Sequence, residues 1–465
     1  MRGDPGPPKD GARSMSVVRS ISRELADFVV STTYQDLPSE VIHTTKRAML
    51  DLIGCGLAGV AGDDIQALVR GLKEYDSGSQ AVIWGTCESA SLSGAALVNG
   101  TAAHAREFDD CGGPGHVGTV VIPASLAVGG LRNRTGKELI AAVALGYEVL
   151  FRLTDGAGGY RALAEPGWHP ISVVGGFGSA AAGGKLEGLD PDQLTSALGL
   201  AGSFTGGSYA FIDDGSMAKR WHAGRASANG VEAVYLAKGG FSGPSRILEA
   251  SWGSWYNAHF PNETPDFPSI TRGLGTQYRM PDTTFKAYPC CLGIHQHLEA
   301  YAEIVESEGL EPQAIERIEA DVHEMSAKMI GKCEVETTLD AQMSLAYTLA
   351  VFSFAGCLTL AEFEFEKLTD PAVTELSRRV QIMRTGEDAE NELRVYLLDG
   401  RVVRRRLSPE KGSLERPMSD EDLSRKFTEL AAPVLGSADA SSVADMVWAL
   451  DELESVCELS NLLCP

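Results

Sequence analysis

The stretch that most constrains the fold is SVVGGFGSAAAGGKLEGL, residues 172 to 189, in which small side chains fill most positions. If this stretch is helical, each of its glycines costs roughly 1 kcal/mol relative to alanine. Only burial among other helices, with backbones in close approach where side chains are small, offsets that cost. The sequence therefore predicts a buried helix inside a large helical domain.

The surrounding sequence supports a helical domain. From about residue 15 to 260 the chain is rich in Ala, Gly, Leu and Val at helical spacing, with little of the alternation that marks strands. The segment EVIHTTKRAMLDLIGCGLAG carries apolar side chains three, four and seven positions apart, as in a helix with one buried face. These side chains are Ile42, Met49, Leu52, Ile53 and Leu57.

The pattern changes further along the chain. The segment from about 250 to 285 has Pro, Gly, Asn and aromatic residues without a period, which indicates a long connection or a domain boundary. IERIEADVHEM (315 to 325) alternates in part, and ELRVYLLDGRVVRRRL (392 to 407) has two β-rich runs joined by Asp399-Gly400, a hairpin signal. Ser419 and Asp422 then form a capping pattern that predicts a return to helix.

These patterns predict a mainly α fold. At 465 residues the chain exceeds one ordinary core. We expect a helical domain built from both ends, residues 15–280 plus 411–465, with an α+β domain inserted at 281–410. Residues 1–14, MRGDPGPPKDGARS, lack an apolar signal core and are predicted to be a disordered tail.

The net charge and the cysteine content limit the classes of partner and the cellular compartment that we expect. A formal net charge of -23 argues against nucleic acid and anionic membranes as partners, because both need a surplus of Lys and Arg on one face. The nine cysteines form no disulfide framework, which fits a reducing, cytoplasmic location. The longest apolar-rich run, residues 139 to 151, contains Glu148 and is too short to span a bilayer.

Four short, mostly glycine-containing stretches hold the residues that can carry chemistry: HAREFDDCGGPGH (104–116), GWHP (167–170), KRWHAG (219–224) and KAYPCC (286–291). The first is compatible with a metal site, an acid–base cluster or an acidic loop. The histidines never fall in the HExxH or CxxC…HxxxH spacings of zinc sites. Taken singly, each histidine is better explained as a partly buried side chain with a hydrogen-bond partner.

Together the four stretches predict a site for a polycarboxylate. Holding two or three carboxylates away from water needs several fixed cationic donors, for which Lys219, Arg220 and Lys286 are candidates. Moving a proton at carbon near neutral pH needs an acid and a base with tuned pKa values. His116 and His169 suit that role.

The ordered set of these stretches, with DLIGCGLAG (51–59) and FSGPSRILEA (241–250), resembles the MmgE/PrpD family over about residues 20 to 430. This family includes 2-methylcitrate dehydratase and cis-aconitate decarboxylase. The resemblance implies a homodimer without metal or cofactor, with a large helical domain, a smaller α+β lid and the site between them. It also implies dehydration, decarboxylation or epimerisation of small di- or tricarboxylates.

The resemblance is uneven residue by residue. The G-x-H-P and K-x-x-H-x-G motifs are complete, and K-x-[FY]-P falls on 286–289. The family's D-x-D-D-T motif has Glu107 for its first Asp and Cys111 for its Thr, and its H-P-S motif keeps only His116. The resemblance implies catalytic roles for His116, His169 and Lys219, and substrate binding by Glu107, Asp110, Cys111, His222, Lys286 and Cys291.

Two positions keep alternatives open. Asp109 and Asp110 are equally well explained as structural acceptors that fix their loop. Cys291 stands where the cis-aconitate decarboxylase has a histidine, which weakens the decarboxylase interpretation, and it is equally well explained as a small packing residue.

The predicted function is a cofactor-independent lyase, acting on a citrate-like or an aconitate-like acid by His/Lys acid–base catalysis. One alternative is an epimerase of a small dicarboxylate such as iminodisuccinate. Another is a polycarboxylate-binding homologue without catalytic activity.

Overall fold

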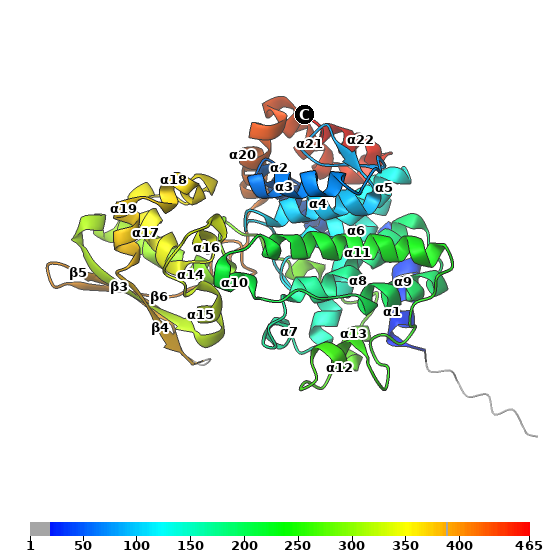
Figure 1. The fold of residues 1–465 in the computed structure, drawn as a ribbon, viewed down its shortest axis with the longest axis horizontal. Helices are drawn as coiled ribbons and strands as arrows, with labels where there is room; N and C mark the ends of the chain where they lie inside the picture. The colour runs from blue at the N-terminus through cyan, green and yellow to red at the C-terminus, as the bar shows by residue number, and fades with distance from the viewer. Residues whose placement is uncertain (1–18, 387–388) are drawn as a thin grey trace, which may run out of the picture.

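The computed structural model describes residues 19–386 and 389–465, so the predicted tail at 1–14 lies outside the described residues. The chain is mainly helical with a small sheet, as predicted (Figure 1). Two main hydrophobic cores divide it. The large body is built on core residues 25–285 and 418–463, and the sheet body on core residues 290–397.

The large body holds most of the helices. In chain order they are α1 (Ile21–Ser31), α2 (Ser39–Val60), α3 (Asp63–Lys73), α4 (Leu92–His104), α5 (Gly118–Leu131), α6 (Gly136–Gly156), α7 (Tyr160–Ala164), α8 (Pro170–Glu187), α9 (Pro191–Ser203), α10 (Phe211–Asp214), α11 (Ala218–Lys238), α12 (Trp255–His259) and α13 (Phe267–Thr271). A two-stranded ribbon, β1 (Ala81–Val82) with β2 (Ser89–Ala90), precedes α4.

Helix α8 lies at the centre of the large body, packed against α5, α6, α9 and α11. Its small residues are required by these contacts. A Cβ at Gly178 would lie 2.5 Å from Leu150 of α6, and a Cβ at Gly230 of α11 would lie 2.4 Å from Ser179 of α8. The prediction of a buried, closely packed helix is confirmed.

The sheet body combines helices with a four-stranded sheet. Its elements are α14 (Leu292–Glu308), β3 (Ile315–His323), α15 (Glu324–Ile330), α16 (Thr338–Gln342), α17 (Leu345–Ala355), α18 (Phe365–Leu368), α19 (Pro371–Ser377), β4 (Val380–Thr385), β5 (Glu392–Leu397) and β6 (Val402–Arg406). The strand order is β4-β3-β5-β6, with β3 and β4 parallel and the other pairs antiparallel. The predicted hairpin is confirmed, with Gly400 at φ 88° in its turn.

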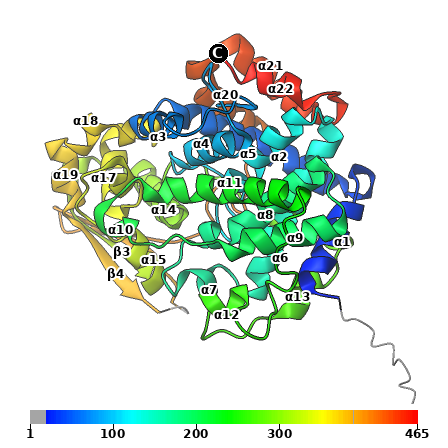
Figure 2. The same cartoon turned by 45° about the vertical axis from the view of Figure 1, so that its right-hand side comes forward.

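The chain returns to the large body at its C-terminal end. Helix α20 (Asp420–Leu435) packs on α2, and α21 (Ser437–Trp448) and α22 (Val456–Leu462) follow it (Figure 2). Ser419 and Asp422 form the predicted capping box at the start of α20. Helices from both ends of the sequence thus share one core.

Two further sequence features have a clear position. The apolar run at 139 to 151 lies in α6, where it is buried in the core. Within the described residues, no single helix is both long and apolar enough to cross a membrane, although α2 and α3, bent by 82° relative to each other, pass such a test as a pair. All nine cysteines are free thiols.

Candidate active site

Four helices begin at one cavity of about 490 Å³. His116 lies just before α5, His169 is the N-cap of α8, Lys219 is in the first turn of α11, and Cys291 is the N-cap of α14. The free NH groups and the dipole at a helix N-terminus favour a bound anion. The architecture of the large body therefore directs partial positive charge into the cavity.

Most of the predicted site residues line this cavity: Glu107, Cys111, His116, His169, Lys219, Lys286 and Cys291. They come from segments far apart in the sequence. The loop after α4 is fixed to the segment before α14, because Cys111 and Thr284 exchange backbone hydrogen bonds of 2.9 and 2.8 Å. This bridge holds the segment that carries Glu107 beside the segment that carries Lys286.

Asp110 does not line the cavity, which argues against its predicted role in substrate binding. Its carboxylate is fully buried, and one oxygen accepts a hydrogen bond of 2.7 Å from the Tyr147 hydroxyl. The other oxygen accepts one of 3.1 Å from the Gly118 backbone NH, at the start of α5. Both oxygens therefore fix the loop to the helical core, which is the alternative that the sequence left open.

His222 also lies behind the cavity wall rather than in it. Its Nδ1 is 3.3 Å from Nδ1 of His169. Burial lowers the pKa of His222 to about 4 and that of His169 well below its ordinary value, so both rings are neutral and one Nδ1–H donates to the other. The structure thus makes His222 the partner that orients His169, in place of a direct contact to substrate.

Glu107 lies between the two lysines. The Lys219 ammonium donates to its carboxylate, and the Lys286 ammonium donates to its carbonyl oxygen at 2.9 Å and to its carboxylate at 3.4 Å. Burial alone would raise the Glu107 pKa, but the charges of both lysines outweigh it and hold the pKa below its usual value. The carboxylate therefore stays ionised and orients both ammonium groups.

The backbone at Glu107 is strained, with φ at 52° in the left-handed region that side chains other than Gly, Asn and Asp rarely adopt. Strain of this kind persists only where the surroundings enforce it, and it is common at functional sites. Here the two lysines and the bridge at Cys111 enforce it. No sequence pattern predicted this conformation.

Asp109 links two histidines. One of its oxygens is 3.1 Å from Nδ1 of His104 and the other is 2.7 Å from Nδ1 of His116. Burial lowers the pKa of both histidines, to about 3 for His104. Burial would also raise the pKa of Asp109, but the two imidazoles outweigh it and hold that pKa well below its ordinary value.

These contacts define the tautomers. A carboxylate can only accept, so Nδ1 carries the hydrogen on both rings and each Nε2 has a lone pair. Nε2 of His104 faces the Lys219 ammonium at 3.0 Å and receives its hydrogen bond. His116 lines the cavity, and its contact with Asp109 does not use its Nε2.

His104 and Asp109 were missed as site residues by the sequence interpretation. The signal was present in HAREFDDCGGPGH, where an acid lies between two histidines in one short stretch. A carboxylate that receives the Nδ1–H of a histidine is the usual device for setting its tautomer. The sequence could not show which of the adjacent acids, Asp109 or Asp110, does so.

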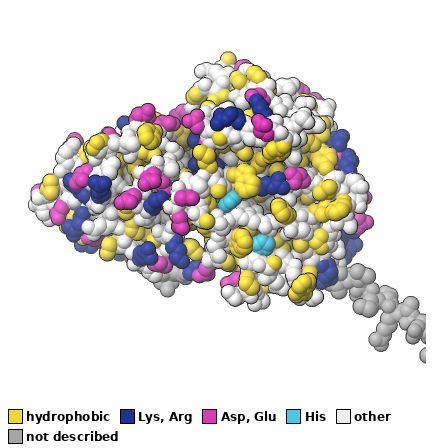
Figure 3. Space-filling view, in the orientation of Figure 1, with side chains coloured by type: hydrophobic (Ala, Val, Ile, Leu, Met, Phe, Trp, Pro, Cys, Tyr) yellow, Lys and Arg dark blue, Asp and Glu magenta, His cyan; other side chains and the backbone are white. Residues whose placement is uncertain are grey.

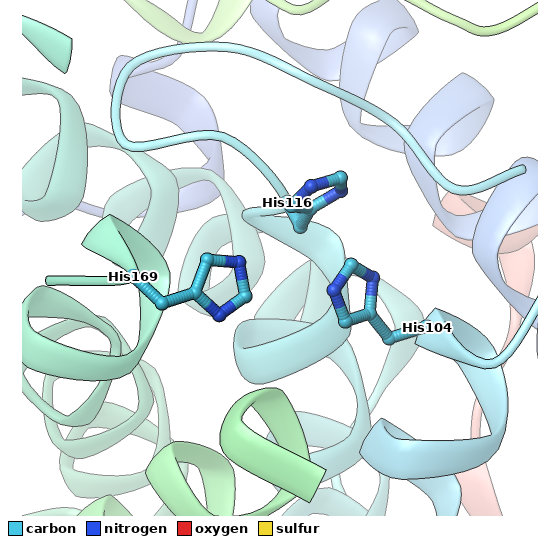
Figure 4. A group of neighbouring side chains, drawn as sticks. All are labelled: His104, His116 and His169. Carbon is cyan, nitrogen blue, oxygen red and sulfur yellow. The ribbon is translucent and has the colours of Figure 1, made fainter. Parts of the chain in front are cut away.

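Three histidines point toward one another, His104, His116 and His169 (Figure 4). Their potential ligand atoms lie within 4.8 Å of one another, as in a metal site. However, the lone pair of His104 already receives the Lys219 ammonium, whose charge would repel a cation. Only two histidines then remain as ligands, fewer than a zinc site uses. The donor set fits acid–base chemistry better than metal binding.

The two cysteines of the cavity are not activated thiols. Burial raises the pKa of Cys111 and of Cys291, so both stay protonated at neutral pH. Two tyrosines complete this part of the wall, with the hydroxyl groups of Tyr160 and Tyr209 2.7 Å apart. These hydroxyls are additional hydrogen-bond donors that the sequence interpretation did not include.

Lys426 of α20 supports the site from behind. Its ammonium donates to the carbonyl oxygens of Phe108 at 2.6 Å and Lys286 at 3.0 Å. It also forms a buried ion pair of 2.7 Å with Asp51 of α2. One C-terminal side chain thus holds together the two segments that carry Glu107 and Lys286.

Comparison with known families covers nearly the whole chain. The model of the MmgE/PrpD N-terminal domain matches residues 23–268, and that of the MmgE/PrpD C-terminal domain matches residues 288–452. His116 and His169 lie in the first match, and Cys291 lies in the second. Lys286 falls between the two.

Curated relatives are similar over most of their length. The cis-aconitate decarboxylase of Mus musculus is 28% identical over 96% of this chain and 94% of its own length. The cis-aconitate decarboxylase of Aspergillus terreus is 27% identical over 96% of each chain. The probable 2-methylcitrate dehydratase of Saccharomyces cerevisiae is 23% identical over 77% of this chain and 73% of its own.

Proposed function

Because the chain belongs to the MmgE/PrpD family, we propose that it is a lyase acting on a small tricarboxylic acid without a metal or an organic cofactor. One observation carries the proposal. A neutral histidine base, His116, lines the same buried cavity as two lysine ammonium groups. A base and an acid in opposite protonation states at neutral pH are what an elimination requires.

Substrate binding is assigned to the positive groups of the cavity. Lys219 and Lys286 hold carboxylates of the substrate, helped by the N-termini of α8, α11 and α14. Glu107 keeps the two ammonium groups in place. Fixed donors hold the reacting carbon beside His116, which lowers the entropic part of the barrier.

The first reaction that we propose is elimination of water from a citrate-like acid. Nε2 of His116 takes the proton from the carbon next to a carboxylate, and the electron pair forms the new double bond. The carbon–oxygen bond breaks, and the departing hydroxyl takes a proton from the Lys219 ammonium. His116 keeps its proton until it exchanges with solvent, while Asp109 stabilises the imidazolium formed.

Decarboxylation of an aconitate-like acid is the second candidate, supported by the decarboxylase names of the relatives. Here a carbon–carbon bond breaks, carbon dioxide leaves, and the electron pair must take up a proton at carbon. The neutral histidines are poor donors for that step, which leaves the Lys219 ammonium. Cys291 stands where the cis-aconitate decarboxylase has a histidine, and a thiol cannot bring an imidazolium to a carboxylate. The site therefore supports dehydration better than decarboxylation.

Epimerisation remains a third outcome of the test. The ring centroids of His116 and His169 are 6.1 Å apart, so one carbon between them could exchange a proton with each ring. Such an enzyme would incorporate solvent deuterium into recovered substrate of inverted configuration. A lyase would instead release water or carbon dioxide.

The experiment is a mass-spectrometric screen of the purified protein against citrate, 2-methylcitrate, cis-aconitate and iminodisuccinate, run in water and in deuterium oxide. The proposal predicts a product lighter by one water, or by one carbon dioxide, from at least one tricarboxylate. Binding of the acids without any product would favour a non-catalytic homologue. Recovery of the substrate with one deuterium from the solvent, and with no loss of water or carbon dioxide, would favour the epimerase.

We also propose that the sheet body closes over the cavity as a lid and that two chains form a dimer. Cavity-lining residues from both bodies support the first. Exposed apolar side chains on and beside α11 support the second, since a patch of this kind is typical of an interface (Figure 3). They include Met217, Trp221, Leu236 and Phe241.

A further inference from the structure

The cavity continues from the catalytic residues into the sheet body. Its lining there comes from α14, from β3 and α15, and from the segment that follows the β5–β6 hairpin. Apolar side chains such as Val322, Met329 and Leu407 form much of this wall. Among them are three polar side chains, His297, His323 and Glu410, whose hydrogen-bonding capacity the proposed reaction does not use.

His297 presents an unused acceptor. It is 4% exposed, and its Nε2 lies 2.8 Å from the backbone carbonyl of Asp321, so Nε2 carries the hydrogen. Burial lowers the pKa of His297, so the ring is neutral and Nδ1 has a lone pair. Nδ1 is buried and has no hydrogen-bond partner in the described part of the chain. A buried acceptor without a partner favours a ligand that donates to it.

His323 and Glu410 add acceptors of the same kind. Nδ1 of His323 lies 2.9 Å from the carbonyl of Gly386, so in its neutral form Nε2 is an acceptor. Glu410 is 8% exposed, and one of its oxygens accepts a hydrogen bond of 2.9 Å from Gln296. Within residues 19–386 and 389–465 no ion pair compensates its charge.

The two ends of the cavity thus have opposite character. The first end, at Lys219 and Lys286, offers donors and positive charge. The second end, at His297 and Glu410, offers acceptors and negative charge. His297 is six residues beyond Cys291 along α14, a rise of about 9 Å along the helix that lines both ends.

We propose that the cavity binds a bipolar molecule, a polycarboxylate with an arm that ends in a protonated amine. The carboxylates lie at Lys219 and Lys286, and the ammonium group donates to His297 and Glu410. The inference rests on the proposed function for the carboxylate end. It goes beyond it because a plain tricarboxylate leaves the acceptor end without a partner.

The test uses two amides of tricarballylate, a tricarboxylate with no hydroxyl to eliminate and no double bond. One carries a 5-aminopentyl arm and the other a hexyl arm of equal length. Calorimetric titration should show the amine-ended amide binding at least tenfold more tightly than the methyl-ended one. The Glu410→Gln variant keeps the size of the side chain and removes its charge, so that advantage should fall to about twofold or less.

Plain tricarballylate is the matched control, because it has no ammonium group to donate to Glu410 and should bind both proteins equally. Equal binding of the two amides to the unsubstituted protein would overturn the inference, as would an amine advantage that persists in Glu410→Gln. If tricarballylate itself fails to bind, the carboxylate end is wrong and the proposed function fails with it. If tricarballylate binds and the amine adds nothing, only the inference fails.

Discussion

Asp109 determines the protonation of the whole site, because one carboxylate receives the Nδ1–H of both His104 and His116. This contact has a different effect on each of the two histidines. On His116 it leaves a base facing the cavity, and on His104 it leaves an acceptor that orients Lys219. Asp109 therefore keeps His116, the proposed base, unprotonated at Nε2. Through His104 it also orients Lys219, the proposed proton donor.

Replacing Asp109 with Asn tests this arrangement. The amide keeps the shape but can donate to one ring nitrogen, which favours the wrong tautomer of His116. We expect kcat to fall by about 10²- to 10⁴-fold, the range seen when a general base is misoriented. Steady-state kinetics with the substrate found in the screen measure this, and near-UV circular dichroism checks the fold. An unchanged kcat would remove Asp109 from the account.

Variants of His169 and His222 distinguish a residue that contacts the substrate from one that only orients it. His169 lines the cavity, so His169→Ala should abolish measurable turnover while the protein stays folded. His222 does not line the cavity and contacts His169 from behind its wall, so His222→Ala should leave partial activity. Turnover and a thermal melt of both variants decide this. Full activity in His169→Ala, or a larger loss in His222→Ala, would contradict the assignment.

The pH profile has a defined direction. Burial lowers the pKa of His116 below its ordinary value near 6.5, and the base form is the neutral one. Lowering the pH through that pKa protonates the base, so kcat/KM should be level across neutral pH and fall only on the acid side. A rate that falls as pH rises from 6 to 8 would mean that a protonated histidine is needed. That result would favour decarboxylation with histidine as the proton donor.

At the scale of residues, the sequence pointed to the stretches that line the cavity but not to the hydrogen bonds between them. The motif residues His116, His169, Lys219 and Lys286 could be selected because their residue types match acid–base and anion chemistry. The roles of Asp109 and Asp110 could not be separated, because adjacent residues in a loop point in different directions. That choice depends on Tyr147 and Gly118, whose position follows from helix packing.

At the scale of elements, the site is made by helix beginnings. Helices α5, α8, α11 and α14 each start at the cavity, and each places a site residue at or near its first turn. The glycine-rich sequence of α8 predicted a buried helix, since its propensity is low without close packing. It could not predict that the four N-termini meet, because that depends on the crossing of helices distant in sequence.

Helix α20 contributes through Lys426, which can be tested by Lys426→Met. The substitution leaves the buried Asp51 carboxylate without its partner, and we expect a loss of about 3 to 5 kcal/mol in the free energy of unfolding. Catalysis should weaken as well, because the segments of Glu107 and Lys286 lose their common donor. Urea denaturation and kinetics measure the two effects.

The double variant Asp51→Asn with Lys426→Met serves as the control. Removing the unpaired charge should restore most of the lost stability, whereas the carbonyl oxygens of Phe108 and Lys286 still lack their donor. Stability should therefore recover while activity does not. A parallel recovery of both would show that Lys426 acts on the fold alone.

At the scale of the whole molecule, the local features were the most predictable. The mainly helical character, strand β3 and the β5–β6 hairpin follow from short-range patterns, and all are confirmed. The parallel pairing of β3 with β4 could not be predicted, because it joins segments that no local pattern links. The same is true of the cavity, which needs side chains from both bodies.

The central claim is that a neutral histidine and two ammonium groups, without a metal, carry out the reaction. The most direct measurement is turnover of the acid found in the screen by protein stripped with a strong chelator, for the unsubstituted chain and for His116→Gln. We expect full activity in the stripped protein and none in His116→Gln, with both equally folded. Activity that disappears on stripping and returns with zinc, or that survives in His116→Gln, would contradict it.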